Sequence, residues 1–200
     1  MSEKYYITIG RQLGSGGREI GKKLANSLGI SYYDKEIITL ASKESGLNKH
    51  FFKKADEKIR FTPFDNFFGM QFSKNYLGNE TLFEIQSNII RELAEKHSAL
   101  FVGRCADYIL REYSRRLDIF ITADKEDRIK RTAKRKNISH KEAEELNLKI
   151  DRKRKEYYNF YNNRIWGRAD SYHLCINSST LGIDETVNFI FKFIKQKLEL

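Results

Sequence analysis

Proline and cysteine are scarce in this sequence, and neither residue marks a domain boundary or a covalent framework. Pro63 is the single proline among 200 residues, and no Gly/Ser-rich linker divides the chain. The two cysteines, Cys105 and Cys175, lack the spacing of a metal site or of a disulfide framework. We therefore expect one domain over residues 1–200, large enough to bury a core, with both thiols free and buried.

Long apolar runs are also missing, which argues against a membrane-spanning helix. Residues 1–4 lack the core of a signal peptide, so the expected location is the cytoplasm. Acidic residues are outnumbered, with 37 Lys and Arg against 27 Asp and Glu, and the formal net charge is +10. That charge would attract phosphorylated small molecules, nucleic acid or acidic surfaces, and a solvated lysine-rich surface explains it equally well. Because no nucleic-acid-binding motif is found, nucleic acid is not the expected partner.

Strand-like and helix-like segments alternate along the chain. Expected strands cover residues 5–9, 30–33, 99–102, 117–121 and 172–176. Expected helices cover residues 18–28, a stretch after Asp34, about 79–96, a stretch to about 112, 124–136, 139–158 and 183–198. This alternation predicts an α/β fold: a P-loop-like three-layer sandwich with a five-stranded parallel sheet, helices on both faces and a helical lid. Ligands of such sheets bind beyond the carboxyl ends of the strands.

A glycine-rich turn joins the first expected strand to the first expected helix. It contains Gly14, Ser15, Gly16 and Gly17, and Arg18 follows at the start of the helix. Glycines let backbone N–H groups converge on an anion, and a helix N-terminus adds unpaired N–H groups and partial positive charge. A tight turn that needs glycine for its shape alone is the alternative. The segment predicts a loop that binds the phosphates of a nucleotide.

The strict pattern G-x-x-x-x-G-K-[ST] is not met in this turn. When Gly16 is aligned with the second glycine, Gly17 stands in the place of the lysine and Arg18 in the place of the hydroxyl residue. That lysine normally reaches the terminal phosphates, and the Ser or Thr normally binds Mg²⁺. We therefore expect Arg18 to supply positive charge, and Mg²⁺ to be held through phosphates and water without a protein metal site.

Residues 7–20 resemble the opening of the cytidylate kinase-like family. Further resemblances follow in the same order along the chain: Tyr32 to Glu36, Phe101 to Arg104, the D-x-x-R-x-x-Y-Y…W pattern from Asp151 to Trp166, and residues 172–181. The resemblance covers nearly the whole chain and is weakest over residues 48–78. It implies the fold of a nucleoside monophosphate kinase, with a nucleotide-binding flank at about residues 35–96 and a mobile lid at about residues 124–166.

The resemblance also implies roles for particular residues. The turn from Gly14 to Arg18 would cradle the donor phosphates of ATP. Asp34, Arg104 and Asp107 would face the acceptor, with Arg104 near its phosphate. Further arginines would neutralise the transferred phosphoryl group together with Arg18, and these lie in the lid: Arg128, Arg131 and Arg154.

Several of these side chains have a structural alternative. A role of Asp34 as the cap of the following helix is the alternative to a role in binding. Arg128, Arg131 and Arg135 recur at helical spacing, and a solvated basic stripe accounts for them as well as a phosphate clamp does. Arg152 and Arg154 lie on different faces of their helix, so we expect only one of them to point inward.

The expected function is ATP-dependent phosphoryl transfer to a nucleoside monophosphate, with CMP as the acceptor that the resemblance implies. Two alternatives remain: a nucleotide- or phosphate-binding protein without transfer, which the missing lysine favours, and a kinase of another small substrate. Residues 48–78 carry seven phenylalanines among lysines. Packing on the core of the domain is the favoured reading of this segment, and an interface between two copies of the chain is the alternative.

Overall fold

The computed structural model describes residues 3–34 and 76–200 of the chain. Two expectations therefore lie outside the described residues. These are the helix after Asp34 and nearly all of the aromatic segment at residues 48–78, with the interface it would form. Within the described ranges, no helix combines the length and the apolar character needed to cross a membrane.

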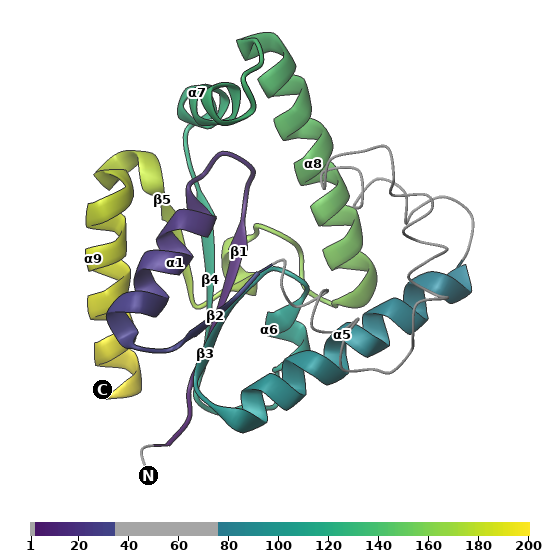
Figure 1. Ribbon diagram of the computed structural model, residues 1–200, viewed down its shortest axis with the longest axis vertical. Helices are drawn as coiled ribbons and strands as arrows, with labels where there is room; N and C mark the ends of the chain where they lie inside the picture. Colours follow the sequence, from purple (N-terminus) through teal and green to yellow (C-terminus); the bar gives the residue numbers. More distant parts are fainter. Residues whose placement is uncertain (1–2, 35–75) are drawn as a thin grey trace.

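The sheet consists of parallel strands in the order β2-β3-β1-β4-β5. The strands are β1 (Tyr6–Arg11), β2 (Ser31–Tyr33), β3 (Ala99–Val102), β4 (Arg116–Thr122) and β5 (Leu174–Asn177). Ile9 of β1 lies beside Val102 of β3 and beside Ile119 of β4, so β1 is the central strand. Because all the strands run the same way, the turns after β1, β3 and β4 meet at one edge of the sheet (Figure 1).

Helices cover both faces of this sheet. The helices α1 (Gly17–Leu28) and α9 (Ser178–Leu198) share one apolar core with Ile7 and Ile9 of β1. On the other face, α5 (Tyr76–Lys96) and α6 (Ala106–Ile109) share a second core with Tyr6. Alternate residues of a strand point to opposite faces, so β1 serves both layers. The predicted three-layer α/β sandwich is confirmed.

Two further helices lie over the carboxyl edge of the sheet, at the top of Figure 1. They are α7 (Lys125–Lys136) and α8 (His140–Tyr161), and they pack against each other. The Ser139 side chain accepts from the Glu142 amide at 3.2 Å, and the Glu142 carboxylate accepts from the Ser139 amide at 2.9 Å. This is the capping box that the sequence predicted at the start of the helix. Both helices fall within the expected lid, whose movement stays a prediction.

The helix expected to extend to about residue 112 is shorter than predicted. It ends at Ile109, and it begins at Ala106 after a left-handed stretch in which Gly103, Arg104 and Cys105 have φ values of 76°, 61° and 54°. Near the C-terminus, η2 (Ala169–Ser171) precedes β5, which begins two residues later than expected. The last helix begins at Ser178, earlier than expected, and is interrupted at Gly182.

The prediction that both cysteines are buried is wrong for one of them. Cys105 is part of the turn after β3 and is buried, and burial raises the pKa of its thiol well above the usual value. Cys175 is exposed. It lies on β5, which is the edge strand of the sheet and pairs only with β4. Neither thiol is in a disulfide.

Candidate functional site

A small cleft, open to solvent, lies at the carboxyl ends of β1 and β3. The guanidinium-bearing side chains of Arg11, Arg104 and Arg154 face it from three different segments. Aromatic side chains line it as well, and they come from α8 and from the residues before β5: Tyr157, Tyr158, Trp166 and Tyr172. The cleft therefore combines positive charge with flat apolar walls at the edge where the sequence predicted ligand binding.

The shape of the glycine loop beside this cleft is set by its backbone conformation and by hydrogen bonds of the Ser15 side chain. Gly14 and Gly16 have φ values of 79° and 77°, a conformation that is strained for residues with a side chain. The Ser15 hydroxyl donates to a loop carbonyl at 2.9 Å and accepts from the Gly17 amide at 3.3 Å. Within the part of the chain that the structure describes, the amides of Gly14, Gly16 and Arg18 have no hydrogen-bond partner. These amides stand at the N-terminus of α1, which favours an anion.

The helices α7 and α8 bind the glycine loop through the buried carboxylate of Asp151. Asp151 of α8 accepts a hydrogen bond from the Leu13 amide at 2.8 Å and pairs with Arg128 of α7. Arg128 also donates to the Leu13 carbonyl at 2.8 Å, so both the amide and the carbonyl of Leu13 are hydrogen-bonded to this helix pair. Arg154 donates to the Arg11 carbonyl at 3.0 Å and lies 3.4 Å from Asp151.

The predicted arginines of the lid differ in where they point. Arg131 donates to the Gly14 carbonyl at 3.3 Å, so it joins Arg128 and Arg154 around the loop. Arg135, the next member of the expected stripe, is exposed on α7. Arg152 is exposed while Arg154 faces the cleft, as the two helix faces predicted. Since three of these side chains bind loop carbonyls, they fix the loop's shape as well as adding charge beside it.

Asp34, at the end of β2, is buried between two arginines of the glycine-loop segment. It pairs with Arg18 Nε, and its other oxygen lies 3.5 Å from Arg11 Nη2. The Arg18 side chain is 44% exposed, whereas that of Arg11 is 15% exposed. Arg18, which the sequence proposed as the source of charge for the donor phosphates, is thus directed toward the predicted acceptor residue Asp34.

The guanidinium groups of the three arginines of the cleft are partly desolvated by burial. Burial lowers the pKa of Arg11 to about 10 and that of Arg154 to about 9, and it lowers the pKa of Arg104 as well. All three stay protonated near neutral pH. Because desolvated charges of one sign lie around one space, an anion entering it would relieve their mutual repulsion.

Asp107 lies in the first turn of α6 and lines the same cleft. Its carboxylate accepts a hydrogen bond from the Tyr158 hydroxyl at 2.5 Å. Burial raises the pKa of Asp107 to about 6, the Tyr158 hydrogen bond lowers it, and the nearby charge of Asp118 raises it again. This carboxyl group therefore changes its charge close to neutral pH.

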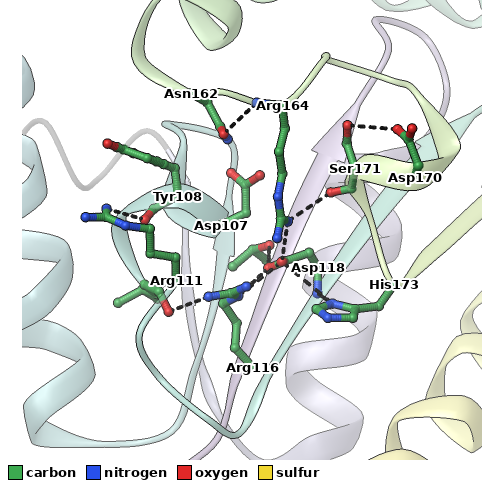
Figure 2. A network of polar contacts seen from close by, with 12 residues as sticks. Asp107, Tyr108, Arg111, Arg116, Asp118, Asn162, Arg164, Asp170, Ser171 and His173 are labelled. Carbon is green, nitrogen blue, oxygen red and sulfur yellow. Dashed lines mark hydrogen bonds and ion pairs between the residues drawn. The ribbon is translucent and has the colours of Figure 1, made fainter.

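A second acidic group, Asp118 on β4, ties the sheet to the segment between α8 and β5. Its side chain is fully buried, and it accepts from Arg116 Nε at 2.8 Å. Figure 2 shows Arg164 reaching Asp118 from above, with Nη1 at 3.4 Å, while the same nitrogen donates to the Ser171 carbonyl at 3.1 Å. These contacts fix the segment that carries Trp166 into the cleft wall.

The Asp107→Asn variant is expected to make the free energy of unfolding less dependent on pH. The folded state holds the Asp107 proton more tightly than the unfolded chain does, since its pKa is about 6 against 3.8. The wild type therefore loses stability as the pH rises through that window. At pH 7.5 the variant should be more stable by about 3 kcal/mol, and at pH 3.5 the two should be nearly equal. Urea denaturation at both pH values measures this, and an equal difference at both would contradict it.

Two residues of the site were not assigned a role from the sequence. Arg11 lies at the start of the glycine-rich segment, six residues before Gly17, and the sequence carries no signal that the two positions are close in space. Asp151 was noted only as part of a motif, although its spacing of three residues from Arg154 places both on one helix face. Among residues 3–34 and 76–200, no three His, Cys, Asp or Glu side chains form a group that would hold a metal ion.

The parallel sheet, the glycine loop at the start of α1 and the helices over its edge define a P-loop kinase fold. Two solved kinases share it at low identity. A shikimate kinase from Bacteroides thetaiotaomicron has a TM-score of 0.56, 14% identity, and coverage of 98% of this chain and 99% of that chain. A gluconokinase from Sinorhizobium meliloti 1021 has a TM-score of 0.54, 13% identity, and coverage of 98% and 94%.

The chain belongs to the cytidylate kinase-like family, whose model matches residues 6–180. A solved structure of an uncharacterized protein from Eubacterium ventriosum ATCC 27560 is similar over nearly the full length. It shares 30% identity, has a TM-score of 0.74, and covers 96% of this chain and 99% of its own. No curated protein matches the sequence. The resemblance seen in the sequence is thereby confirmed at the level of the family.

Proposed function

We propose that this protein transfers the terminal phosphoryl group of ATP to a nucleoside monophosphate, with CMP as the default acceptor. The observation that carries the proposal is the cleft itself. Arg11, Arg104 and Arg154 converge there beside the glycine loop, and aromatic rings form its wall. A mononucleotide offers what this arrangement would bind, because it joins a phosphate dianion to a flat base.

The donor side of the proposed site is the glycine loop. The amides of Gly14, Gly16 and Arg18 fit the phosphates of ATP, and the α1 N-terminus adds favourable polarity. Arg128, Arg131 and Arg154 hold the loop carbonyls, so those amides keep their direction when phosphate enters. Mg²⁺ bound through phosphate oxygens and water would neutralise part of the phosphate charge.

The acceptor side is formed by the end of β2 and the turn after β3. Arg104 would bind the acceptor phosphate, and Asp34 and Asp107 would bind its sugar or base. In the reaction, an acceptor phosphate oxygen forms a bond to the γ-phosphorus of ATP. The bond from that phosphorus to the β,γ-bridging oxygen breaks, and ADP leaves. Catalysis of this kind depends mainly on positioning and charge neutralisation.

Initial rates of ADP formation across a panel of acceptors would test the proposal. CMP, UMP, AMP and GMP should include at least one acceptor that raises the rate well above ATP hydrolysis in water alone. Shikimate, the ligand of one kinase with this fold, serves as an acceptor with a hydroxyl in place of a phosphate. Binding of ATP with no acceptor-dependent rate would support a nucleotide-binding protein that lacks transfer. A rate only with shikimate would support a kinase of another small substrate.

The Arg104→Ala variant is expected to weaken acceptor binding far more than donor binding. Loss of a buried, charge-assisted hydrogen bond to the acceptor phosphate should raise KM for the monophosphate by about 10- to 100-fold, or about 1.5–3 kcal/mol. KM for ATP should change by less than about threefold. Arg152→Ala, at an exposed position on α8, is the control. Equal losses for both substrates would contradict the assignment of Arg104 to the acceptor.

A further inference from the structure

The space where a loop lysine would begin is filled by another side chain. A Cβ atom added to Gly17 would lie 2.6 Å from Cβ of Arg11 and 3.1 Å from its Cγ. The first of these distances is too short for any real side chain, and the nearer atom is fixed to the backbone of β1. The absence of a lysine at position 17 is therefore tied to the presence of Arg11.

The guanidinium of Arg11 extends from the glycine loop to the turn after β3. Its Nη1 atom occupies the space that a Cβ atom on Gly103 would take, and the φ value of 76° at Gly103 favours glycine there as well. Its Nη2 atom lies 3.5 Å from Asp34, which also pairs with Arg18. The Arg11 side chain thus lies between the donor loop and the residues proposed for the acceptor. Gly17 lies next to its Cβ and Cγ atoms, and Gly103 lies next to its guanidinium group.

The charge around Arg11 favours an additional anion. Arg18 shares the Asp34 carboxylate with Arg11, and Arg104 and Arg154 line the same cleft. Among residues 3–34 and 76–200, Asp34 is the one carboxylate that pairs with Arg11, and at 3.5 Å it is a weak partner for a guanidinium that is 15% exposed. A phosphoryl group between the loop and β3 would offer the bidentate oxygens that arginine binds well.

We infer that Arg11 takes the role of the missing lysine, binding the terminal phosphoryl group of the donor from the end of β1 instead of the start of α1. The inference rests on the proposed function and assigns a catalytic residue to it. Gly17 and Gly103 have a defined purpose in this arrangement, because each leaves room for one part of the Arg11 side chain.

The test compares ATP with ADP, since only ATP carries the group that Arg11 would bind. Isothermal titration with each nucleotide and Mg²⁺ gives two dissociation constants, independently of catalysis. Arg11→Met should weaken ATP binding by at least about tenfold and ADP binding by less than about threefold. Arg152→Met is the matched control and should change neither. Equal effects on both nucleotides, or none, would overturn the inference.

Variants at positions 11 and 17 test where the Arg11 side chain lies, and this test does not require that Arg11→Met folds. Gly17→Lys alone should lower the melting temperature, because its Cβ atom would clash with the Cβ atom of Arg11. Adding Arg11→Ala to Gly17→Lys should not restore the melting temperature, because alanine retains that Cβ atom. The double variant Arg11→Gly with Gly17→Lys should fold and regain the preference for ATP that Arg11→Gly loses. An unchanged melting temperature in Gly17→Lys would show that the space is open, which contradicts the inference.

The outcomes separate this inference from the proposed function. If the wild type binds ATP and transfers phosphate while Arg11→Met keeps the ATP preference, the function stands and the role of Arg11 is wrong. If the wild type prefers ATP through Arg11 yet transfers to no acceptor, the role of Arg11 in binding the terminal phosphoryl stands and the transfer proposal is wrong. If the wild type does not bind ATP, both are wrong.

Discussion

Replacing Asp151 with alanine is expected to lower the free energy of unfolding by about 3–5 kcal/mol and to release the glycine loop. The side chain is 12% exposed and joins Arg128, Arg154 and the Leu13 amide. Its removal leaves two mostly buried guanidiniums and one buried amide without their shared acceptor. Burial raises the pKa of Asp151 although both arginines lower it, so the cluster is costly to bury and depends on all of its members.

Urea denaturation and amide exchange at Leu13 measure the two effects of Asp151→Ala. The exchange rate of that amide should rise by more than the loss of global stability accounts for, because its acceptor is gone. Glu145→Ala, at an exposed position on the same helix, should leave both quantities near the wild-type values. An Asp151→Ala protein with normal stability and a protected Leu13 amide would show that α8 does not hold the loop.

The Asp118→Ala variant is expected to be destabilised by a similar amount, about 3–5 kcal/mol. Asp118 is fully buried and accepts from the Thr8 hydroxyl at 2.8 Å and from Arg116 at 2.8 Å. Arg164 lies 3.4 Å away and connects this carboxylate to the segment after α8. Without the carboxylate, Arg116 keeps a buried charge, and the segment that carries Trp166 loses its anchor.

Thermal or urea denaturation measures the stability of Asp118→Ala, and tryptophan fluorescence reports on its single indole, Trp166. Glu126→Ala, at an exposed position on α7, is the control, for which no measurable change is expected. A loss of stability with an unchanged Trp166 spectrum would mean that Asp118 supports the sheet but not the wall of the cleft.

Much of the fold was predictable because each element carries its own local signal. The alternation of apolar strands with amphipathic helices predicted the parallel sheet, and Ser139 with Glu142 predicted the start of α8. The helix expected to extend to about residue 112 ends at Ile109, and the left-handed backbone of residues 104–105 before it follows from the turn after β3 and not from residue preference. Cys175 was misjudged because the sequence does not reveal which strand lies at the edge of the sheet.

The site was predictable in its location but not in its contacts. The family resemblance placed Arg128 and Arg131 in a lid over the glycine turn, whereas their helical spacing alone left a solvated stripe equally possible. Their targets, the loop carbonyls and Asp151, depend on how α7 and α8 lie over the sheet, and local spacing does not encode that. Arg11 was overlooked because its importance arises from the space above Gly17, which only the assembled loop shows.

Phosphorus NMR of a mixture of ATP, CMP, Mg²⁺ and the protein follows the proposed transfer itself, because it identifies the bond that forms. We expect the CMP signal to decrease as signals of a diphosphate linkage in CDP appear, together with those of ADP. Another monophosphate that gives its own diphosphate would keep the reaction class and change only the acceptor. ATP that stays intact with every monophosphate, or that yields only inorganic phosphate, would contradict the proposed function.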